Sequence, residues 1–541
     1  MAPESVDVII VGCGPVGAMA ANLLGQQGVR TLVIERETEP NGQSRAFSLD
    51  DETQRIFQSV GLVGELDPGF LPCRRLQYLN DDLVSLAEVD FTKVDMPYSH
   101  FACAFFQQPR MEAALHKGMA RFPHVSLWRG HEVESFVQDD EGVTARVKEC
   151  GTEHAVTVRA RYLLACDGAH SAIRRRLGLQ LQGTTALEHS LAISVTTASP
   201  EPAFTAYLCG PNRRGFITRT SRDEMRFDVI LAPDQDLEAA RRPEYVRNII
   251  SHYVDPATVK VRSANVYSYH SRITEKWQVG RVFLLGDAAH LMPPFLGQGL
   301  CAGMRDAANL SWKLALVLGD AADASLLDSY EQERRAHVVE IIRGSDAMGR
   351  VMMTGGQLLA RARNALIQVL YRLPFTGEFI RQYKVKPVEP LAQGFLIRGR
   401  RMGKGAAEGN CFPQPRVELP DGTTALLDDV LGEGFAVLTR PGASLDTQRE
   451  ARALAEELGG RWLSVSAAER TGAGRSDGVV DVEGRLGAWF AQHAADLVVL
   501  RPDRYVYGTA GAGQSGQLQG SLRGRIRPLA RRGQGAVRRA G

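Results

Sequence analysis

Hydrophobic positions along the chain fall into short continuous runs and into runs with helical spacing. Residues 6–11 (VDVIIV), 162–165 (YLLA) and 282–285 (VFLL) have the length and apolar composition of buried strands. Apolar residues three or four apart follow two of these runs, at 18–24 and at 300–317, and this spacing predicts helices with one buried face. The order of strand, turn and helix predicts an α/β fold with βαβ units.

The middle of the chain has a different pattern, in which apolar and polar residues alternate one by one. Runs such as 189–197 (HSLAISVTT) and 226–233 (RFDVILAP) are typical of antiparallel strands, and 76–104 contains a similar segment. These segments predict an antiparallel sheet that is inserted into the α/β domain.

Beyond about residue 385 the chain predicts a linker, a second α/β region and a tail. Residues 398–410 (RGRRMGKGAAEGN) are rich in glycine and basic residues, as linkers are, and strand and helix patterns alternate again over 433–507. Residues 508–541 contain no acidic residue and few large apolar ones, so we expect a disordered basic tail there.

A glycine-rich turn joins the first strand to the first helix. Gly12, Gly14 and Gly17 spell G-x-G-x-x-G, in which the first glycine allows a tight turn, the second admits a pyrophosphate and the third lets the helix pack closely. The next strand, 31–34, ends in Glu35, where an acid accepts the ribose hydroxyls of an adenosine cofactor. This unit therefore predicts a site for FAD or NAD(H).

The same spelling occurs at Gly511, Gly513 and Gly516, where the sequence shows no helix pattern after it and no acid beyond Asp503. We do not expect this second copy to bind a nucleotide.

The composition of the chain limits the classes of molecule that it could bind. The chain has 64 Lys and Arg against 62 Asp and Glu, a net charge of +2 over 541 residues, so it has no general attraction for nucleic acid or a membrane surface. No stretch approaches the roughly 18 apolar residues of a membrane span, and the first residues do not resemble a secretory signal. The eight cysteines show neither C-x-x-C nor zinc-ligand spacing, which favours reduced thiols in a cytoplasmic protein without a metal.

Two further motifs follow the later strands. The first is Asp167-Gly168 with Ser171 and Arg174, and the second is 286–300 (GDAAHLMPPFLGQGL). Together with the N-terminal motif, and in this order, they resemble the class A FAD-dependent aromatic monooxygenases, whose fingerprints are G-x-G-x-x-G, D-G-x-x-S-x-[IV]-R and G-D-A-A-H-x-x-x-P. The resemblance runs from about residue 5 to about 507.

Several other segments extend this resemblance. They are SRAFSL at 44–49, QPRMEAAL at 108–115 and SYEQER at 329–334. The segments PPFLGQGLCAGMRDAANLSWKL and PQPRVELPDGTTALLDDVLGEGFAVL are most similar to the 3-(3-hydroxyphenyl)propionate hydroxylase type, whose relatives include polyketide-tailoring aromatic hydroxylases.

The resemblance implies a three-part architecture. A Rossmann-like FAD domain of the p-hydroxybenzoate hydroxylase type would carry an inserted substrate-binding sheet and a thioredoxin-like C-terminal domain. Because that last domain lacks C-x-x-C, it would have a structural or dimer-contact role rather than a redox role. We expect the FAD domain at 1–75, 105–180 and 275–395, the substrate sheet at 76–104 and 181–274, the thioredoxin-like domain at 396–507 and the tail at 508–541.

The resemblance also implies cofactor contacts. Glu35 would hold the adenosine ribose, Arg45 and Gln108 would lie along the ribityl-diphosphate chain, and Asp287 would accept a ribityl hydroxyl. NADH or NADPH would bind transiently, with Arg45 and Asp167 as candidate contacts. The full set of expected cofactor residues is Gly12, Gly14, Pro15, Gly17, Glu35, Arg36, Arg45, Gln108, Asp167, Gly286, Asp287, Pro294, Gly297, Gly299 and Leu300.

The turn at 293–299 has a chemical reason for its composition. It precedes an amphipathic helix, so the free N–H groups of the helix N-terminus would face the ring of the reduced, anionic flavin and stabilise it by about 0.3–1 kcal/mol. Glycines leave the backbone open to the ring and prolines stiffen the approach, which makes Pro294 and Gly297 candidate catalytic residues. An ordinary helix-entry loop is the alternative interpretation.

On the substrate side, the candidates are Phe216, Arg226, Tyr267 and Tyr269, with His270 or Tyr269 as the base that deprotonates a phenol. Aromatic residues in strands more often serve packing, and that alternative stays open. The hydroxyphenylpropionate type carries R-R-W-E-F where this chain has MRFDVI, which leaves the substrate open.

The resemblance implies that NAD(P)H and O₂ hydroxylate a phenolic ring through a flavin C4a-hydroperoxide. The alternative within the same fold is Baeyer-Villiger oxidation or epoxidation of a polyketide-like product. A flavin-dependent halogenase is disfavoured because W-x-W-x-I-P is missing, and a non-enzymatic FAD-binding protein is a further alternative. The expected partners are a small aromatic substrate and O₂, and a homodimer stays open.

Overall fold

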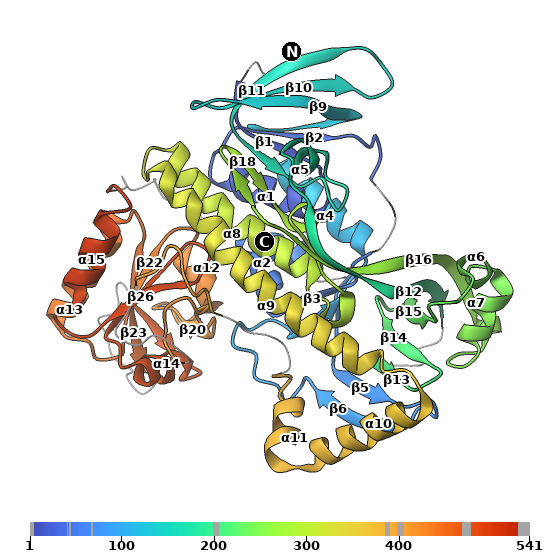
Figure 1. Ribbon diagram of the computed structural model, residues 1–541. Helices are drawn as coiled ribbons and strands as arrows, with labels where there is room; N and C mark the ends of the chain where they lie inside the picture. Colours follow the sequence, from blue (N-terminus) through green and yellow to red (C-terminus); the bar gives the residue numbers. More distant parts are fainter. Residues whose placement is uncertain are drawn as a thin grey trace. The chain divides into compact units, whose positions relative to one another are not determined.

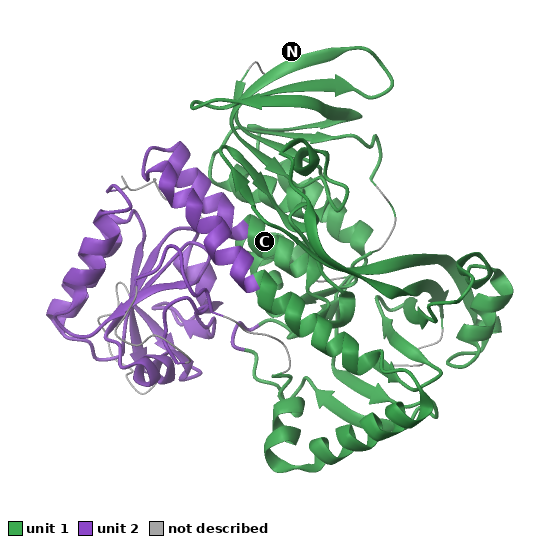
Figure 2. Ribbon diagram, viewed as in Figure 1, with its two compact units in different colours: residues 1–96, 100–307, 338–388 green, residues 97–99, 308–337, 389–541 purple. Residues whose placement is uncertain are grey.

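The computed structural model describes residues 5–40, 42, 45–66, 69–198, 205–384, 390–397, 405–467 and 478–528. The chain forms two compact units (Figure 2). Unit 1 comprises residues 1–96, 100–307 and 338–388, and unit 2 comprises 97–99, 308–337 and 389–541. Among the described helices, none is long and apolar enough to cross a membrane.

Unit 1 contains a sheet with a parallel centre (Figure 1). Residues Val8 to Ile10 have no exposed surface, because strands in a parallel sheet are covered on both faces, which explains the continuous apolar run. The strand order is β17 (Gln278–Val279), β18 (Val282–Leu284), β11 (Ala155–Ala165), β1 (Ser5–Val11), β2 (Thr31–Glu35) and β8 (Val125–Arg129). In addition, β10 (Val143–Glu149) pairs antiparallel with β11, and β9 (His131–Gln138) pairs antiparallel with β10.

Helices α1 (Pro15–Gln26) and α4 (Gln108–Met119) pack against each other beside this sheet. Helix α1 begins at Pro15, three residues before the apolar pattern does, because proline is favoured at the first helical position. Shorter helices of unit 1 are α2 (Asp51–Ser59), α3 (Val63–Leu66) and α5 (Ala172–Arg176).

A second, mostly antiparallel sheet of unit 1 forms from the alternating segments. Its strand order is β19 (His290–Leu291), β16 (Val259–Thr274), β12 (Leu181–Thr197), β15 (Glu224–Leu231), β14 (Arg214–Arg219), β13 (Thr205–Cys209), β5 (Arg75–Leu79) and β6 (Ser85–Asp90). A small third sheet contains β3 (Ser48–Asp50), β7 (Cys103–Phe105) and β4 (Leu71–Pro72).

Alternation along β15 separates the two faces of the second sheet. Met225 and Phe227 join the core under α6 (Leu237–Ala240) and α7 (Pro243–Ile250), whereas Asp228 and Ile230 face a cavity. The same strand therefore supplies both a core and a binding surface.

Long helices follow the second sheet in the chain: α8 (Gly299–Leu318), α9 (Asp328–Met352), α10 (Gln357–Arg372) and α11 (Pro374–Arg381). The first part of α8 and the last part of α9 belong to unit 1, and their remaining residues belong to unit 2. Helices α10 and α11 pack on β6 within unit 1.

Unit 2 carries the predicted thioredoxin-like arrangement. Strands β22 (Ala436–Thr439), β23 (Arg461–Ala467) and β24 (Gly478–Asp481) are parallel to one another. Strand β25 (Leu497–Leu500) pairs antiparallel with β22, and β26 (Val506–Ala510) pairs antiparallel with β25. The order across the sheet is β21 (Thr424–Leu426), β20 (Arg416–Glu418), β24 (Gly478–Asp481), β23 (Arg461–Ala467), β22 (Ala436–Thr439), β25 (Leu497–Leu500) and β26 (Val506–Ala510). The helices are α12 (Leu427–Leu431), α13 (Leu445–Glu457), α14 (Arg485–His493) and α15 (Ser515–Arg523).

The prediction of a disordered tail from residue 508 is wrong for residues 508–528. Strand β26 pairs with β25, and α15 follows it and buries Leu518 and Leu522. The average composition of residues 508–541 gave no indication of these two leucines. They are four residues apart and are enough to anchor a short helix on a core. Residues 529–541 lie outside the described residues.

The second G-x-G-x-x-G segment is therefore followed by a helix, contrary to expectation. Its turn nevertheless offers little to an anion, because Asp496 Oδ2 accepts the N–H of Ala512 at 2.7 Å. An acid already occupies the place that a phosphate would need.

Candidate active site

Three sequence motifs meet at one edge of the parallel sheet. The N–H of Gly12 donates to the carbonyl of Ile34 (2.8 Å), and the N–H of Cys166 donates to the carbonyl of Val11 (2.8 Å). The N–H of Leu285 donates to the carbonyl of Ala165 (3.0 Å), so the chain enters all three motifs side by side. The carboxyl edge of such a sheet is where α/β folds bind nucleotides.

The three glycines of the first motif differ in what surrounds them. A Cβ on Gly12, whose φ is +97°, would lie 2.5 Å from the carbonyl oxygen of Cys166, and one on Gly17 would lie 2.0 Å from that of Gly12. A Cβ on Gly14 would meet nothing within 4 Å. Gly12 and Gly17 are therefore needed for packing, whereas Gly14 leaves an open cradle in front of α1.

Glu35 lies at the end of β2 and faces this turn. Its Oε2 accepts the N–H of Cys13 at 2.7 Å, and its Oε1 accepts the N–H of Glu37 at 2.9 Å. The neighbouring Arg36 is exposed and pairs with Glu37 (3.0 Å). The carboxylate of Glu35 is thus held in one orientation beside the glycine turn.

Gln108 and Arg45 come together through a backbone clamp. Gln108 Oε1 accepts the N–H groups of Arg45 (2.8 Å) and Ala46 (2.9 Å), and its Nε2 donates to Glu112 (2.8 Å). In this structure the Gln108 amide fixes the course of the chain at residues 45 and 46.

Asp167 uses one of its two carboxylate oxygens to bind the first turn of α5. Its Oδ2 accepts the N–H groups of Ala172 (2.7 Å) and Ile173 (3.2 Å), while the buried Oδ1 has no hydrogen-bond partner among the described residues. Arg174, from the same motif, donates to the carbonyl of Ala288 at 3.0 Å. This bond ties the second motif to the third.

Asp306 on α8 organises the third motif from behind. Its Oδ2 accepts from the N–H of Gly286 (3.1 Å) and from Nε2 of His290 (2.7 Å), and the His290 ring stacks on Trp277. The side chain of Asp287 has exposed surface, yet many protein atoms lie around it. This combination is expected for a residue in a deep recess. That enclosure raises the pKa of Asp287, against the opposing charges of His290 and Arg45.

The loop that leads into α8 is tightly fixed. Gly297 has a φ of +64°, and a Cβ there would lie 2.6 Å from Ser48 Oγ. Arg305 holds the loop from α8 by donating to Gln298 (3.1 Å), to Glu52 (2.5 Å) and to Asp50. Helix α8 begins at Gly299 and Leu300, so its free N–H groups lie at this loop.

These features fit a bound flavin dinucleotide. The open cradle at Gly14, the carboxylate of Glu35, the partnerless oxygen of Asp167 and the accessible Asp287 lie along the motifs at the sheet edge. Hydroxyl donors and a diphosphate are the groups that such acceptors and a helix N-terminus bind.

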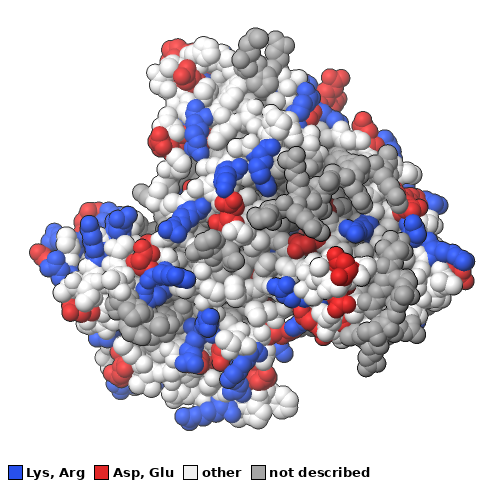
Figure 3. Space-filling model, turned by 180° about the vertical axis from the view of Figure 1, so that it is seen from behind, with Lys and Arg blue, Asp and Glu red and all other residues white. Residues whose placement is uncertain are grey.

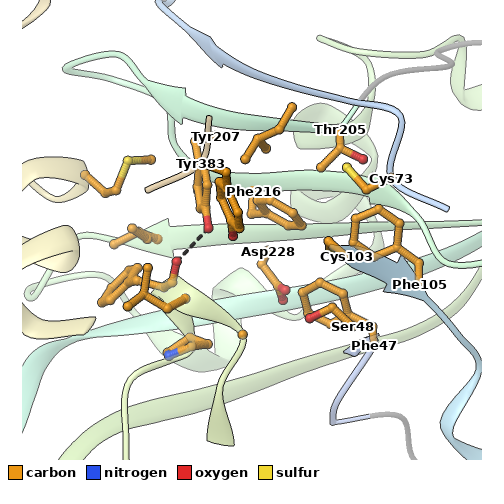
Figure 4. A pocket seen from close by; sticks show the side chains of 18 of the residues that line it. Phe47, Ser48, Cys73, Cys103, Phe105, Thr205, Tyr207, Phe216, Asp228 and Tyr383 are labelled. Carbon is orange, nitrogen blue, oxygen red and sulfur yellow. Dashed lines mark hydrogen bonds between the residues drawn. The ribbon is translucent and has the colours of Figure 1, made fainter. Parts of the chain in front are cut away.

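A cavity with about 710 Å³ of empty space, its open mouth included, lies between the second sheet and the loop at 294–297. Its wall is largely aromatic (Figure 4). The residues around it are Phe47, Ser48, Cys73, Leu76, Phe91, Cys103, Phe105, Thr205, Tyr207, Gly215, Phe216, Asp228, Ile230, Tyr267, Tyr269, Pro294, Phe295, Leu296, Gly297, Met352 and Tyr383.

The structure brings together most of the predicted substrate residues. Phe216, Tyr267 and Tyr269 line the cavity, together with Pro294 and Gly297. Burial raises the pKa of both tyrosines, so they are hydrogen-bond donors near neutral pH rather than bases.

Arg226 and His270 do not line the cavity. Arg226 is buried behind Asp228, to which it donates at 3.0 and 3.2 Å. His270 follows Tyr269 directly on β16 and so points to the opposite face of the sheet, where it contacts Thr185 Oγ1 at 3.0 Å. Its assignment as the base is not supported by this position.

Several cavity residues were not predicted from the sequence. The sequence could best have indicated Asp228, because an acid two positions after Arg226 lies on the same face of the strand as that arginine. Tyr207 donates to the carbonyl of Phe295 at 2.6 Å, and Tyr383 follows α11. No local pattern marked either tyrosine, because both reach the cavity through tertiary packing.

Among the described residues, no group of three or more His, Cys, Asp or Glu side chains is arranged to hold a metal ion.

Comparison with known proteins identifies the class to which this fold and site belong. The model of a family described as an FAD binding domain matches residues 5–345, and that of the HcaD C-terminal domain matches residues 409–525. The match over residues 5–345 shows that the chain belongs to the FAD binding domain family, and FAD is its cofactor.

Within that class the chain belongs with the flavin-dependent hydroxylases. It is 36% identical over 512 residues to a 3-(3-hydroxy-phenyl)propionate/3-hydroxycinnamic acid hydroxylase of Burkholderia vietnamiensis (strain G4 / LMG 22486), covering 92% of each chain. This similarity confirms the predicted family, the FAD-dependent monooxygenases.

Solved structures confirm the fold. The flavin-dependent monooxygenase PieE, solved in complex with FAD and substrate, superposes with a TM-score of 0.77 at 24% identity, over 96% of this chain and 99% of that one. The anhydrotetracycline hydroxylase OxyS of Streptomyces rimosus gives a TM-score of 0.73 at 26% identity, over 97% and 100%.

Proposed function

We propose that this protein uses NAD(P)H and O₂ to hydroxylate a phenolic ring held in the cavity of unit 1. The observation that carries the proposal is that cofactor loop and cavity share a wall, since Pro294 and Gly297 belong to both. A substrate in the cavity would therefore lie against the loop that leads into α8.

The cofactor residues divide the work along the FAD molecule. Bound FAD supplies hydride acceptance from NAD(P)H and, once reduced, activation of O₂. Glu35 would hold the ribose, the turn at Gly14 and the N-terminus of α1 would hold the diphosphate, and Asp287 would accept a ribityl hydroxyl. Arg45 and Asp167 are candidates for the transient contact with the nicotinamide cofactor.

The N-terminus of α8 would stabilise negative charge on the reduced ring. The helix has 20 residues, and Gly299 at its start carries no side chain that would hold a planar group away from the N–H groups. Such a helix end contributes about 0.3–1 kcal/mol, and up to about 2 kcal/mol when it is partly buried.

The cavity would orient the substrate and keep water away from the reacting atoms. Phe47, Phe105 and Phe216 supply flat apolar surfaces for an aromatic ring. A dry, shaped site also protects reactive oxygen chemistry from hydrolysis and loss. The hydroxylase named above acts on hydroxylated phenyl compounds, which supports a phenolic substrate here.

The test is a screen of phenols with the purified holoenzyme. We expect phenols that fit the cavity to accelerate oxidation of NADH or NADPH and to gain one oxygen atom, seen by mass spectrometry, whereas benzene analogues without a hydroxyl are not converted. The proposal fails if NAD(P)H reduces the flavin with none of the phenols, or if no product gains oxygen.

A further inference from the structure

Asp228 is the only carboxylate among the described residues that line the cavity. It lies on β15, and Figure 4 shows its side chain among the rings of Phe47, Phe105 and Phe216. Only about 7% of its surface is exposed, and a buried carboxylate needs hydrogen-bond donors or a counter-ion close by.

The structure supplies that pairing from the sheet itself. Arg226 donates through Nε to Oδ2 (3.0 Å) and through Nη2 to Oδ1 (3.2 Å), while the Tyr267 hydroxyl donates to Oδ1 (3.1 Å). The guanidinium also lies over the ring of Phe47, 4.9 Å from its centre. A two-point salt bridge of this kind fixes the orientation of the Asp228 carboxylate.

Asp228 retains capacity for one further donor. A carboxylate has about four acceptor positions, and these contacts use three of them. The remaining position is on Oδ2. A carboxylate acceptor on a largely aromatic wall is suited to the hydroxyl group of a bound ring.

The same arrangement is unfavourable for an anionic substrate. Among the described lining residues there is no Lys, Arg or His, and the nearby Arg226 is committed to Asp228. A substrate carboxylate would lose its hydration and lie near another negative charge without a counter-ion.

We infer that Asp228, held by Arg226 and Tyr267, accepts the phenolic hydroxyl of the substrate and makes the cavity select uncharged phenols over aryl carboxylates. This inference rests on the proposed function and gives it a substrate class. It separates the chain from the relative named above, whose substrates are carboxylic acids.

A hydrogen bond from the phenol to Asp228 would also affect the reaction. A phenol that donates to Oδ2 gains electron density on its ring as the O–H bond lengthens, which favours attack by an electrophilic oxygen. Asp228 would then be a substrate-contacting residue, and the hydroxyl would set which ring position faces the loop at 294–297.

The first experiment compares three ligands on the wild-type holoenzyme by titrating the flavin absorbance. They are 3-(3-hydroxyphenyl)propanamide, the corresponding propionate and the 3-methoxy form of the amide. We expect the amide to bind at least about tenfold more tightly than the propionate, and about 10- to 100-fold more tightly than the methoxy compound. Equal or tighter binding of the propionate overturns the inference.

The second experiment repeats the titrations with variants. Asp228→Asn should reduce or reverse the preference for the amide, because Arg226 then loses its counter-charge. Glu224→Gln makes the same chemical change on the same strand outside the cavity and should retain the preference. A preference that survives in Asp228→Asn contradicts the role of Asp228.

Asp228→Asn could fail to fold, so Tyr267→Phe gives an independent test. It removes one donor but keeps the salt bridge, and the preference for the amide should persist. If it is lost, the tyrosine hydroxyl rather than Asp228 selects the substrate, and the inference falls. If no phenol of either charge speeds flavin reduction by NAD(P)H, it is the proposed function that fails.

Discussion

Single carboxylates do much of the positioning at the cofactor edge of unit 1. Glu35 uses both oxygens on backbone N–H groups, at 2.7 and 2.9 Å, and so faces the glycine turn in one orientation. Asp306 holds the third motif through one oxygen, Oδ2, which accepts from the N–H of Gly286 and from Nε2 of His290. An acid can receive two donors at once, which is why residues of this type are found where a turn must be held and a ligand bound.

Glu35→Gln tests the residue scale. The amide keeps an acceptor for Cys13 but removes the charge, so hydrogen bonds from the ribose should weaken and the dissociation constant of FAD should rise roughly tenfold. Fluorescence titration of the apoprotein with FAD measures this constant. Glu37→Gln, two residues away and exposed, is the control and should bind FAD normally; an unchanged constant in Glu35→Gln would contradict the assignment.

At the scale of elements, the join between β1 and α1 depends on how closely they approach. Gly17 lets the helix pack against the turn, and Gly14 opens the same turn to a ligand. One strand–turn–helix unit thus contains one glycine that close packing requires and another whose side has open space, where we propose that the cofactor binds. The sequence motif alone does not separate these two roles.

Substituting alanine at each position should separate them. In Gly17→Ala the new Cβ would lie 2.0 Å from the carbonyl oxygen of Gly12, so we expect a loss of stability of about 1–3 kcal/mol or more. Gly14→Ala should fold with a nearly unchanged melting temperature but bind FAD more weakly. Thermal unfolding of both apoproteins, followed by FAD titration, decides the matter; a Gly14→Ala protein that unfolds early would refute the distinction.

At the scale of the whole molecule, unit 2 has a buried ionic centre of its own. Glu333 on α9 contacts Lys313 on α8 at 2.8 Å and Arg501 at 2.8 Å, and all three side chains are fully buried. Burial raises the pKa of Glu333, but the charges of Arg501 and Lys313 and their hydrogen bonds lower it further, to about 2. This centre connects both helices to the chain segment that follows β25.

Glu333→Gln should destabilise unit 2 by about 3–5 kcal/mol, because the buried Lys313 loses its carboxylate partner and the buried Arg501 keeps only Asp503. Since the pKa is lower in the folded state than the usual 4.5, the unfolded state binds more protons between pH 4.5 and 2, and the wild-type protein loses stability as the pH falls through that range. Denaturant unfolding at several pH values should show this component in the wild type and not in Glu333→Gln.

The control for this experiment is Glu340→Gln, an exposed pair with Arg343 on the same helix, which should change stability by less than about 1 kcal/mol. Equal stability of wild type and Glu333→Gln at pH 7 would rule out the ionic centre as a determinant of folding.

The sequence by itself determined the FAD-binding family and the fold class. The motifs at Gly12, Asp167 and Asp287 consist of local turns whose chemistry depends on neighbours in the chain, so spacing alone is informative. The alternation around 226–233 likewise predicted a strand with two different faces.

Only the tertiary structure decided which side chains share the cavity. Strand alternation turned His270 away from Tyr269, and Tyr383 reached the cavity from beyond α11. The order of residues 508–528 was also decided by packing, since β26 needs β25 as a partner and α15 needs a core to cover. Burial and pairing depend on residues that are distant in the chain, and no local pattern records them.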